Sequence, residues 1–298
     1  MENMILFMQQ TPAAFYVFIA VIGLLVGSFL NVVIHRLPII MKREMVVNAR
    51  EVLEQELTEE EQKWENDKFN LVVPRSRCPK CGHKITALEN IPVISYLFLG
   101  GKCSECKAKI SIRYPIIEFV TAVLSVLVAV YFGVTWAALA GLVLTWCLIA
   151  LTMIDFDTYF LPDSITLPLI WIGLLLSMYG VFNVDLKSSI YGAVFGYMSL
   201  WLVYHAFKLL TGKEGMGYGD FKLLAVLGAW MGWKMLPVII LFSSLVGAVV
   251  GIAMVIVMGR DKNIPIPFGP YLAAAGFIAF LWGEKILNAY LGTGSFVG

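Results

Sequence analysis

Charged residues are scarce in this chain. Only 14% of its 298 residues are Asp, Glu, Lys or Arg, whereas 59% are hydrophobic and the mean hydropathy is +0.80. Soluble domains are about 45–50% apolar and about 25% charged. One compact core cannot bury so large an apolar share, and this excludes an ordinary soluble protein. We therefore predict an integral membrane protein.

Several other features are missing or rare. The chain has three histidines and five cysteines, and its net charge is only +1. No glycine-rich loop follows a strand pattern, so no dinucleotide-type cofactor fold is predicted. Nothing in the sequence predicts a nucleic-acid partner. The first apolar segment has no preceding basic region and is too long for a signal-peptide core, so we expect a retained helix.

Long apolar runs predict an all-α polytopic membrane protein with about eight transmembrane helices. A helix that rises 1.5 Å per residue needs ~20 residues to cross the hydrocarbon core. One run of eleven residues would span only ~16 Å, so its crossing is doubtful. The predicted crossings are Ala13–Ile34, Ile116–Phe132, Thr135–Ile154, Ser164–Tyr179, Ser188–Phe207, the doubtful Leu223–Trp233, Met235–Met258 and Phe268–Trp282.

The basic residues predict how the chain is oriented. Of the 22 Lys and Arg residues, fourteen fall in Arg36–Arg113, between the first two crossings. Cytoplasmic loops are enriched in Lys and Arg, so we expect this segment inside and the N-terminus outside. The same topology places Lys208, Lys213, Lys222, Arg260 and Lys262 inside and only Lys187, Lys234 and Lys285 outside.

These expectations divide the chain into three parts. Residues 1–35 form the first transmembrane helix, 36–114 a cytoplasmic insertion, and 115–298 the transmembrane core. Within the insertion, Met41–Lys68 mixes charges of both signs with apolar residues and has no Gly or Pro. This pattern predicts a solvated helix over the cytoplasmic face.

Four of the five cysteines form two C-x2-C pairs. Cys78 and Cys81 are followed, after twenty-one residues, by Cys103 and Cys106. Two such knuckles supply the four thiolates of a closed tetrahedral zinc site, which is typical of a structural ion. Disulfides or a redox pair are the alternatives, but disulfides are rare in a reducing cytoplasm. An iron centre of the same geometry stays open.

Two aspartates lie at the ends of apolar runs. Asp155 occurs in "MIDFDTYFLPD" and Asp220 in "GMGYGDFK". Two crossings separate them, so both are expected at the cytoplasmic boundary. Two carboxylates within hydrogen-bonding reach share one proton, which gives one acid and one base. The alternative is a structural role at a solvated helix end, and Asp163 is expected to cap a helix and lie in its first turn.

A series of motifs in order carries a family resemblance. The chain resembles the bifunctional type 4 prepilin peptidases over nearly its whole length. The matching motifs are "GSFLNVVIHRLP" (Gly27–Pro38), "RSRCPKCGHKI" (Arg75–Ile85), "ENIPVISYL" (Glu89–Leu97), "CSEC", "SIRYPIIE" (Ser111–Glu118), "MIDFDTYFLPD", "GMGYGDFK" and "PFGPYLA" (Pro267–Ala273).

The resemblance implies a membrane aspartic protease with a Gly-x-Gly-Asp motif. The family's catalytic acids match Asp155 and Asp220. Such enzymes of the bacterial inner membrane remove the short basic leader of type IV prepilins and pseudopilins on the cytoplasmic side. They then methylate the new N-terminal amine with S-adenosylmethionine. The four-cysteine segment is typical of the bifunctional members.

Two other classes compete with this interpretation. In a proton-coupled transporter the two aspartates would carry protons, but acids deeper in the bilayer are then expected. A non-enzymatic docking partner would use the zinc module and leave both aspartates unexplained. No sequence motif marks the site of methyl transfer, and we expect it near polar residues that flank helix ends close to the zinc module: Asn31, Arg36, Arg113 and Glu118.

Overall fold

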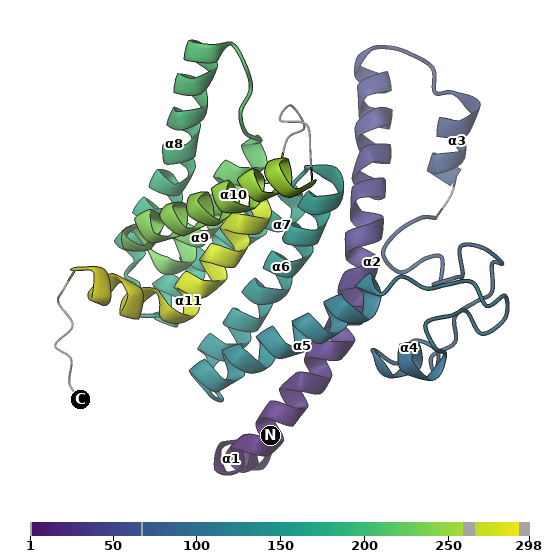
Figure 1. Ribbon diagram of the computed structural model, residues 1–298, viewed down its shortest axis with the longest axis horizontal. Helices are drawn as coiled ribbons and strands as arrows, with labels where there is room; N and C mark the ends of the chain where they lie inside the picture. Colours follow the sequence, from purple (N-terminus) through teal and green to yellow (C-terminus); the bar gives the residue numbers. More distant parts are fainter. Residues whose placement is uncertain (1, 67, 259–265, 292–298) are drawn as a thin grey trace. The chain divides into compact units, whose positions relative to one another are not determined.

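The computed structural model describes residues 2–66, 68–258 and 266–291, and this part of the chain is helical (Figure 1). Its only extended pairings are two isolated antiparallel bridges, Arg77–Lys84 and Lys102–Lys109. The chain divides into two compact units, Met1–Val134 and Thr135–Gly298. The all-α prediction is confirmed.

Six of the described helices are long and apolar enough to cross a membrane, so this is a multi-pass membrane protein. Two further apolar helices, α7 (Asp163–Met178) and α9 (Tyr218–Met231), have only 16 and 14 residues. They correspond to the fourth predicted crossing and to the doubtful sixth. Arg260 and Lys262 lie outside the described residues. The six spans are Pro12–Val52, Arg113–Phe132, Trp136–Thr158, Leu186–Thr211, Trp233–Val257 and Gly269–Ala289.

The first span is longer than predicted. After α1 (Glu2–Gln10), α2 (Pro12–Val52) runs for 41 residues. That is ~62 Å of helix, about twice the ~30 Å thickness of the hydrocarbon core. The predicted crossing ends at Ile34, and the helix itself continues for 18 residues beyond it. Pro38 lies inside the helix. The helix ends at Val52, and Glu54, two residues later, takes a left-handed backbone conformation with φ 51°.

One helix over Met41–Lys68 was a wrong prediction. The first part of that segment continues α2, and a separate short helix, α3 (Glu59–Asn66), follows. A capping box begins α3: Thr58 N–H donates to Glu61 Oε2 at 2.8 Å, and Glu61 N–H donates to Thr58 Oγ1 at 3.4 Å. This reciprocal pair satisfies backbone donors that a helix start leaves free, so a new helix starts here.

In the first unit, α2 packs closely against α5 (Arg113–Phe132) through two glycines. A Cβ on Gly23 would lie 2.7 Å from Ala122 Cα, and one on Gly27 would lie 2.7 Å from Glu118 Cα. Glycines four residues apart let two membrane helices approach to backbone contact, where van der Waals packing is strongest. The pair Gly23 and Gly27 therefore sets the closest approach of α2 and α5.

The second unit is built around α9. Every residue from Asp220 to Met231 is buried except Lys222, which is partly exposed. The helix packs against α7, α8 (Leu186–Thr211) and α11 (Gly269–Leu291). A Cβ on Gly192 of α8 would overlap the carbonyl of Gly228 of α9. Because protein surrounds α9, its length need not match the thickness of the lipid.

Side-chain hydrogen bonds tie α9 to its neighbours. Ser189 Oγ of α8 donates to the carbonyl of Ala229, and Trp230 Nε1 donates to the carbonyl of Leu169 of α7 at 2.8 Å. Both donors are buried. A buried donor left without a partner is costly, so these bonds fix how α9 lies against α7 and α8.

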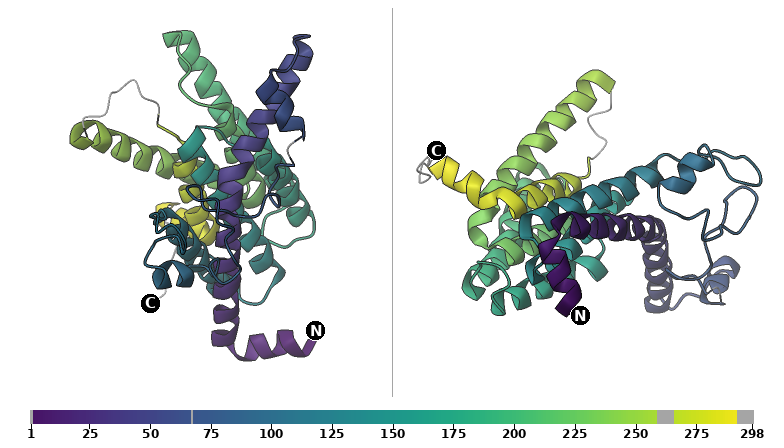
Figure 2. Two further views of the ribbon diagram at one scale, coloured as in Figure 1. Left: turned by 90° about the vertical axis from the view of Figure 1, so that its right-hand side faces the viewer. Right: turned by 90° about the horizontal axis from the view of Figure 1, so that it is seen from below.

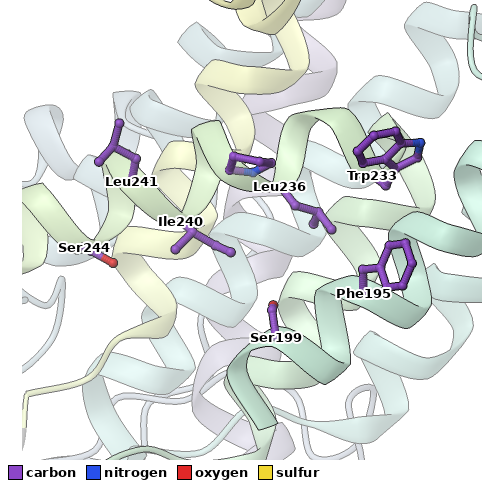
Figure 3. A pocket seen from close by; sticks show the side chains of 8 residues that line it. Phe195, Ser199, Trp233, Leu236, Ile240, Leu241 and Ser244 are labelled. Carbon is purple, nitrogen blue, oxygen red and sulfur yellow. The ribbon is translucent and has the colours of Figure 1, made fainter. Parts of the chain in front are cut away.

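The C-terminal end of α9 meets the segments that were predicted to lie outside. Lys187, Lys234 and Glu284 line one pocket of about 510 Å³ together with Met231, the last residue of α9. A second, apolar cavity of about 590 Å³ opens beside Trp233, between α8 and α10 (Leu236–Met258) (Figure 3). Figure 2 shows α10 projecting from the rest of this unit. Neither cavity includes Asp155 or Asp220.

We predict that Gly27→Leu destabilises the protein, because the added side chain would strike the backbone of α5. Overpacking of this kind costs about 1–3 kcal/mol. Thermal unfolding of the purified protein in detergent measures the effect. Leu25→Phe is the matched control, since Leu25 lies on the exposed side of the same helix. Equal unfolding temperatures for the two variants would contradict the close α2–α5 contact.

Candidate active site and candidate metal centre

Asp155 lies in the last turn of α6 (Trp136–Thr158) and is only 5% exposed. The helix ends at Tyr159, which takes a left-handed conformation with φ 56° and turns the chain away. Asp155 Oδ2 accepts the backbone N–H of Gly269 at 3.1 Å. A Cβ on Gly269 would lie 2.7 Å from the same oxygen. A residue without a side chain is therefore required where α11 begins.

Asp220 lies in the first turn of α9 and is 7% exposed. Gly217 occupies the N-cap position, and its carbonyl accepts the Asp220 N–H at 3.2 Å. A carboxylate at this position is favoured by the positive end of the helix dipole. The Asp220 and Asp155 carboxylates interact electrostatically. The structure thus brings together two predicted site residues that are 65 positions apart.

A single buried side chain, Leu161, joins the segments around the two acids. A Cβ on Gly219 would lie 2.8 Å from Leu161 Cβ, and one on Gly269 would lie 3.2 Å from Leu161 Cδ1. The α6–α7 connection and the starts of α9 and α11 therefore converge at Leu161. Sequence reasoning missed Leu161 and the role of Gly269, and only the match of "PFGPYLA" to a family motif pointed toward Gly269.

An ion pair fixes the start of α9 against the start of α7. Lys222 Nζ lies 2.7 Å and 2.8 Å from the two carboxylate oxygens of Asp163. Asp163 is in the first turn of α7, as predicted, but the N-cap is Pro162, so the capping prediction is wrong. The pairing with Lys222 accounts for this acid instead. Because Lys222 follows Asp220 by two residues, the ion pair also helps to place Asp220.

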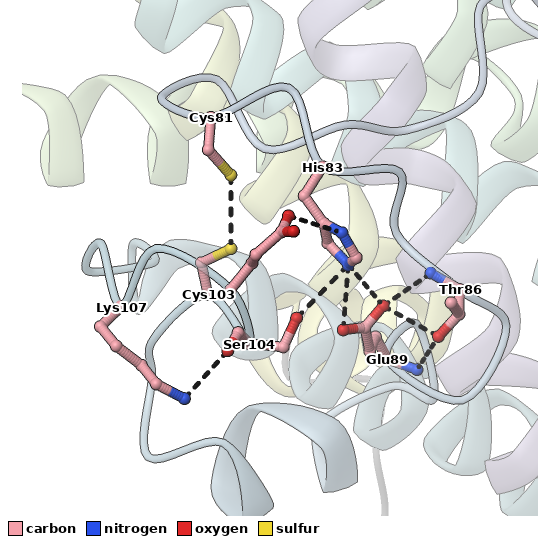
Figure 4. A network of polar contacts seen from close by, with 8 residues as sticks. Cys81, His83, Thr86, Glu89, Cys103, Ser104 and Lys107 are labelled. Carbon is pink, nitrogen blue, oxygen red and sulfur yellow. Dashed lines mark hydrogen bonds and ion pairs between the residues drawn. The ribbon is translucent and has the colours of Figure 1, made fainter.

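The four predicted cysteines of the first unit form one cluster. The Sγ atoms of Cys78 and Cys106 are 3.8 Å apart, those of Cys81 and Cys103 are 3.9 Å apart, and all four lie within 4.8 Å of one another. A tetrahedral ion with metal–sulfur bonds of ~2.3 Å has sulfur–sulfur edges of ~3.8 Å. The donor set and its size therefore fit a four-coordinate metal ion. Figure 4 shows two of these cysteines beside the polar contacts of the loop.

Each C-x2-C pair is held by the same backbone turn. The N–H of Gly82 donates to the carbonyl of Cys78 at 2.9 Å, and the N–H of Lys107 donates to the carbonyl of Cys103 at 3.1 Å. Both donor residues have a left-handed backbone conformation, with φ 72° at Gly82 and 56° at Lys107. The second turn thus accepts a lysine where the first has the glycine that this conformation favours.

His83 braces the loop that carries the first pair. Its Nε2 lies 3.2 Å from Glu89 Oε2, and its Nδ1 lies 3.0 Å from Glu105 (Figure 4). Hydrogen bonds lower the pKa of Glu89 to about 2. The largest effect comes from Ser104 and the next from Thr86. His83 therefore has two carboxylate partners.

Arg36 ties the insertion to α2. Its guanidinium donates to the carbonyls of Asn70 at 2.9 Å and Pro74 at 2.6 Å, and it lies 5.6 Å from the centre of the Phe69 ring. The side chain is buried. Arg36 was one of the residues expected near a methyl-transfer site, and its contacts in this structure are structural.

Glu118 and Asn31 also have structural partners. Glu118 Oε2 accepts the backbone N–H of Val93 at 2.7 Å, and Asn31 Nδ2 donates to the carbonyl of Tyr114 at 3.2 Å. Together with Arg36, the Glu118 bond connects the insertion to α2 and α5, and the Asn31 bond joins α2 to α5. Arg113, the fourth of the expected residues, is the first residue of α5.

The two turns predict opposite responses to substitution. Gly82→Ala should destabilise the metal-loaded cluster by about 1–2 kcal/mol, because a side chain raises the energy of the left-handed conformation. Lys107→Gly should cause no such loss, since it removes that strain. Thermal release of the bound metal to a chromogenic chelator compares the two variants. Equal destabilisation by both would show that the backbone conformation is not the cause.

Comparisons with known proteins extend over both units. Residues 21–132 match the bacterial peptidase A24 N-terminal domain, and residues 142–252 match the type IV leader peptidase family. No solved structure matches the chain.

Several curated relatives bear the name prepilin leader peptidase/N-methyltransferase. One from Pseudomonas aeruginosa is 55% identical over 96% of both chains, and one from Stutzerimonas stutzeri is 56% identical over 96% of both. Another, from Neisseria gonorrhoeae, is 53% identical over 91% of both. This protein therefore belongs to the type IV prepilin leader peptidase/N-methyltransferase family.

Proposed function

We propose that this protein cleaves the short basic leader from type IV prepilins and pseudopilins and then methylates the new N-terminal residue. The relatives' names support the two activities. One structural observation supports the choice of catalytic residues: Asp155 and Asp220 are both buried, and they interact although they come from different helices. The proposed substrate is a protein that presents an apolar helix in the bilayer and a basic leader in the cytoplasm.

The two acids would act as a general acid and a general base. Two interacting carboxylates that are shielded from water do not ionise together easily, so on this proposal they share one proton. The ionised member takes a proton from a water molecule, which attacks the scissile carbonyl. The protonated member then gives its proton to the leaving amine. The Gly269 N–H keeps Asp155 Oδ2 oriented during this exchange.

The active site is proposed to lie at the cytoplasmic face of the inner membrane. We propose that α7 and α9 complete eight crossings. The start of α9 lies beside Asp155 and Leu161, whereas its end lies beside Lys187 and Lys234. On this topology the fourteen Lys and Arg residues of Arg36–Arg113 fall on the same side of the membrane as the first end, in agreement with cytoplasmic enrichment of Lys and Arg. On this topology both aspartates face the cytoplasmic boundary, where the leader joins the apolar helix.

We propose that the four cysteines hold one structural zinc ion. Four thiolates leave no coordination position for water, which is the arrangement of structural sites. Bound zinc would hold together a segment that has few apolar contacts of its own, and its binding would contribute to folding. The cluster belongs to the first unit and the two aspartates to the second. In the three-part organisation we propose, 1–35, 36–114 and 115–298, the ion lies in the cytoplasmic insertion.

Methyl transfer is assigned from the names of the relatives alone. S-adenosylmethionine would supply the methyl group, and the acceptor is the amine that cleavage has just exposed. That amine has to be neutral when it reacts. Arg36 and Glu118 are engaged in the structural contacts described above, so no residue is assigned to this step.

Asp155→Asn and Asp220→Asn should each lower cleavage by about 10²–10⁴-fold, because each removes one partner of the acid–base pair. Mass spectrometry of a full-length prepilin incubated with each purified variant measures leader loss. Asp157→Asn is the matched control, since Asp157 is an exposed acid of the same motif. Cleavage at the normal rate by either Asp155→Asn or Asp220→Asn would exclude the proposed pair.

Cys78→Ser should reduce the bound metal and the yield of folded protein, because structural zinc contributes to folding free energy. The fraction that folds should still remove the leader, since the aspartates lie in the other unit. Metal content is measured by elemental analysis, and cleavage is normalised to folded protein. A metal-free but well-folded variant that cannot cleave would instead assign the ion to catalysis.

A further inference from the structure

A short helix beside the four-cysteine cluster has an apolar face that nothing in the described chain covers. The helix is α4 (Ile94–Phe98). Phe98 is 88% exposed, Leu97 is 71% exposed and Ile94 is 49% exposed. Residues three and four positions apart share one side of a helix, so these three side chains form a single face. We call Ile94, Leu97 and Phe98 the α4 face.

The polar groups of α4 are turned to the protein. Ser95 Oγ donates to the carbonyl of Ile91 at 2.8 Å, and the Tyr96 hydroxyl donates to the carbonyl of Ile110 at 3.5 Å. The α4 face therefore carries no polar side chain. Leaving three large apolar side chains in water is unfavourable, because the free energy falls when their apolar area is removed from solvent.

A hydrogen bond fixes the depth of α4 relative to the membrane-spanning α5. The N–H of Val93, the residue just before α4, donates to Glu118 Oε2 at 2.7 Å. Glu118 is five residues beyond Arg113, the first residue of α5, which is ~7.5 Å along the helix. In Figure 1, α4 lies near the start of α5. The α4 face is thus at the level where α5 enters the bilayer.

The surroundings of α4 have the composition of a membrane interface. Lys102 follows α4 closely and pairs through its backbone with Lys109, and both are exposed. Ile112 and Tyr114 at the start of α5 are exposed as well. Basic side chains are attracted to anionic lipid headgroups, and tyrosine is enriched at the same depth. An apolar face with basic residues beside it is typical of elements that lie in the interface.

We propose that α4 is an interfacial helix whose face inserts into the bilayer that α2 and α5 span. Ile94, Leu97 and Phe98 contact the acyl chains near the headgroups, and Lys102 and Lys109 lie among anionic headgroups. This contact holds the four-cysteine cluster against the membrane surface. The bilayer is the occupant because the bond to Glu118 sets α4 at the depth of a membrane-spanning helix. The inference depends on α5 crossing the membrane and not on the proposed enzymatic activity.

Photo-crosslinking to lipid tests the proposal. Phe98 is replaced by p-benzoylphenylalanine in the full chain, which is reconstituted in vesicles of phosphatidylethanolamine and phosphatidylglycerol. After irradiation, mass spectrometry of the peptide that contains α4 detects any lipid adduct. Because Phe98 is almost fully exposed, the replacement leaves the fold intact, and retention of one bound metal ion per chain checks this.

Val52 provides the matched control. It is 82% exposed and ends α2, and it lies ~27 Å of helix beyond Ile34, outside the hydrocarbon core. We expect a lipid adduct at position 98 and none at position 52. The proposal is overturned if position 98 gives no lipid adduct in a metal-loaded protein, if both positions are labelled equally, or if position 98 links to a second copy of the chain in place of lipid.

Discussion

The second unit depends on holding two carboxyl groups out of water. Asp155 and Asp220 are both buried, and a buried carboxylate is costly unless it is hydrogen-bonded or neutralised. The backbone N–H of Gly269 and the positive end of α9 reduce that cost, and in the proposed mechanism a shared proton reduces it further. Each of these depends on helix ends being placed accurately. The glycines at 219 and 269 and the Leu161 side chain between them make that placement possible.

The same constraint explains why α9 is short. A helix of 14 residues spans only ~21 Å and would leave polar flanks inside the hydrocarbon if it faced lipid. Here almost all of its residues are buried by neighbouring helices, and the close contact at Gly192 and Gly228 brings α8 against it. Protein thus replaces lipid as the surroundings of α9. As a result, Asp220 can lie in the first turn of α9, buried by protein and not exposed to lipid.

Most of the candidate site could be read from local sequence, and what was missed depends on contacts between distant segments. Asp155, Asp220 and the four cysteines stand in short patterns that carry their own chemistry. The bond from Gly269 to Asp155 joins residues 114 positions apart, and no local pattern predicts it. The extension of α2 to Val52 was not predicted, because the predicted crossing ended where the charged residues begin. Charged residues do not end a helix, and α2 continues through them. The capping box of Thr58 and Glu61 was readable and marks where the new helix starts.

In the proposed function, leader cleavage and methylation act one after the other on a single substrate. Cleavage of a leader beside an apolar helix exposes a new amine at the boundary of the bilayer, so an activity that modifies this amine has to work at that depth. The first unit is tied to its membrane helices by Arg36 and Glu118, and the bond to Glu118 sets the depth of α4. A free cytoplasmic domain would lack these ties and could leave the surface. The buried polar contacts of the insertion therefore hold it against α2 and α5, so it stays beside the helices that span the membrane.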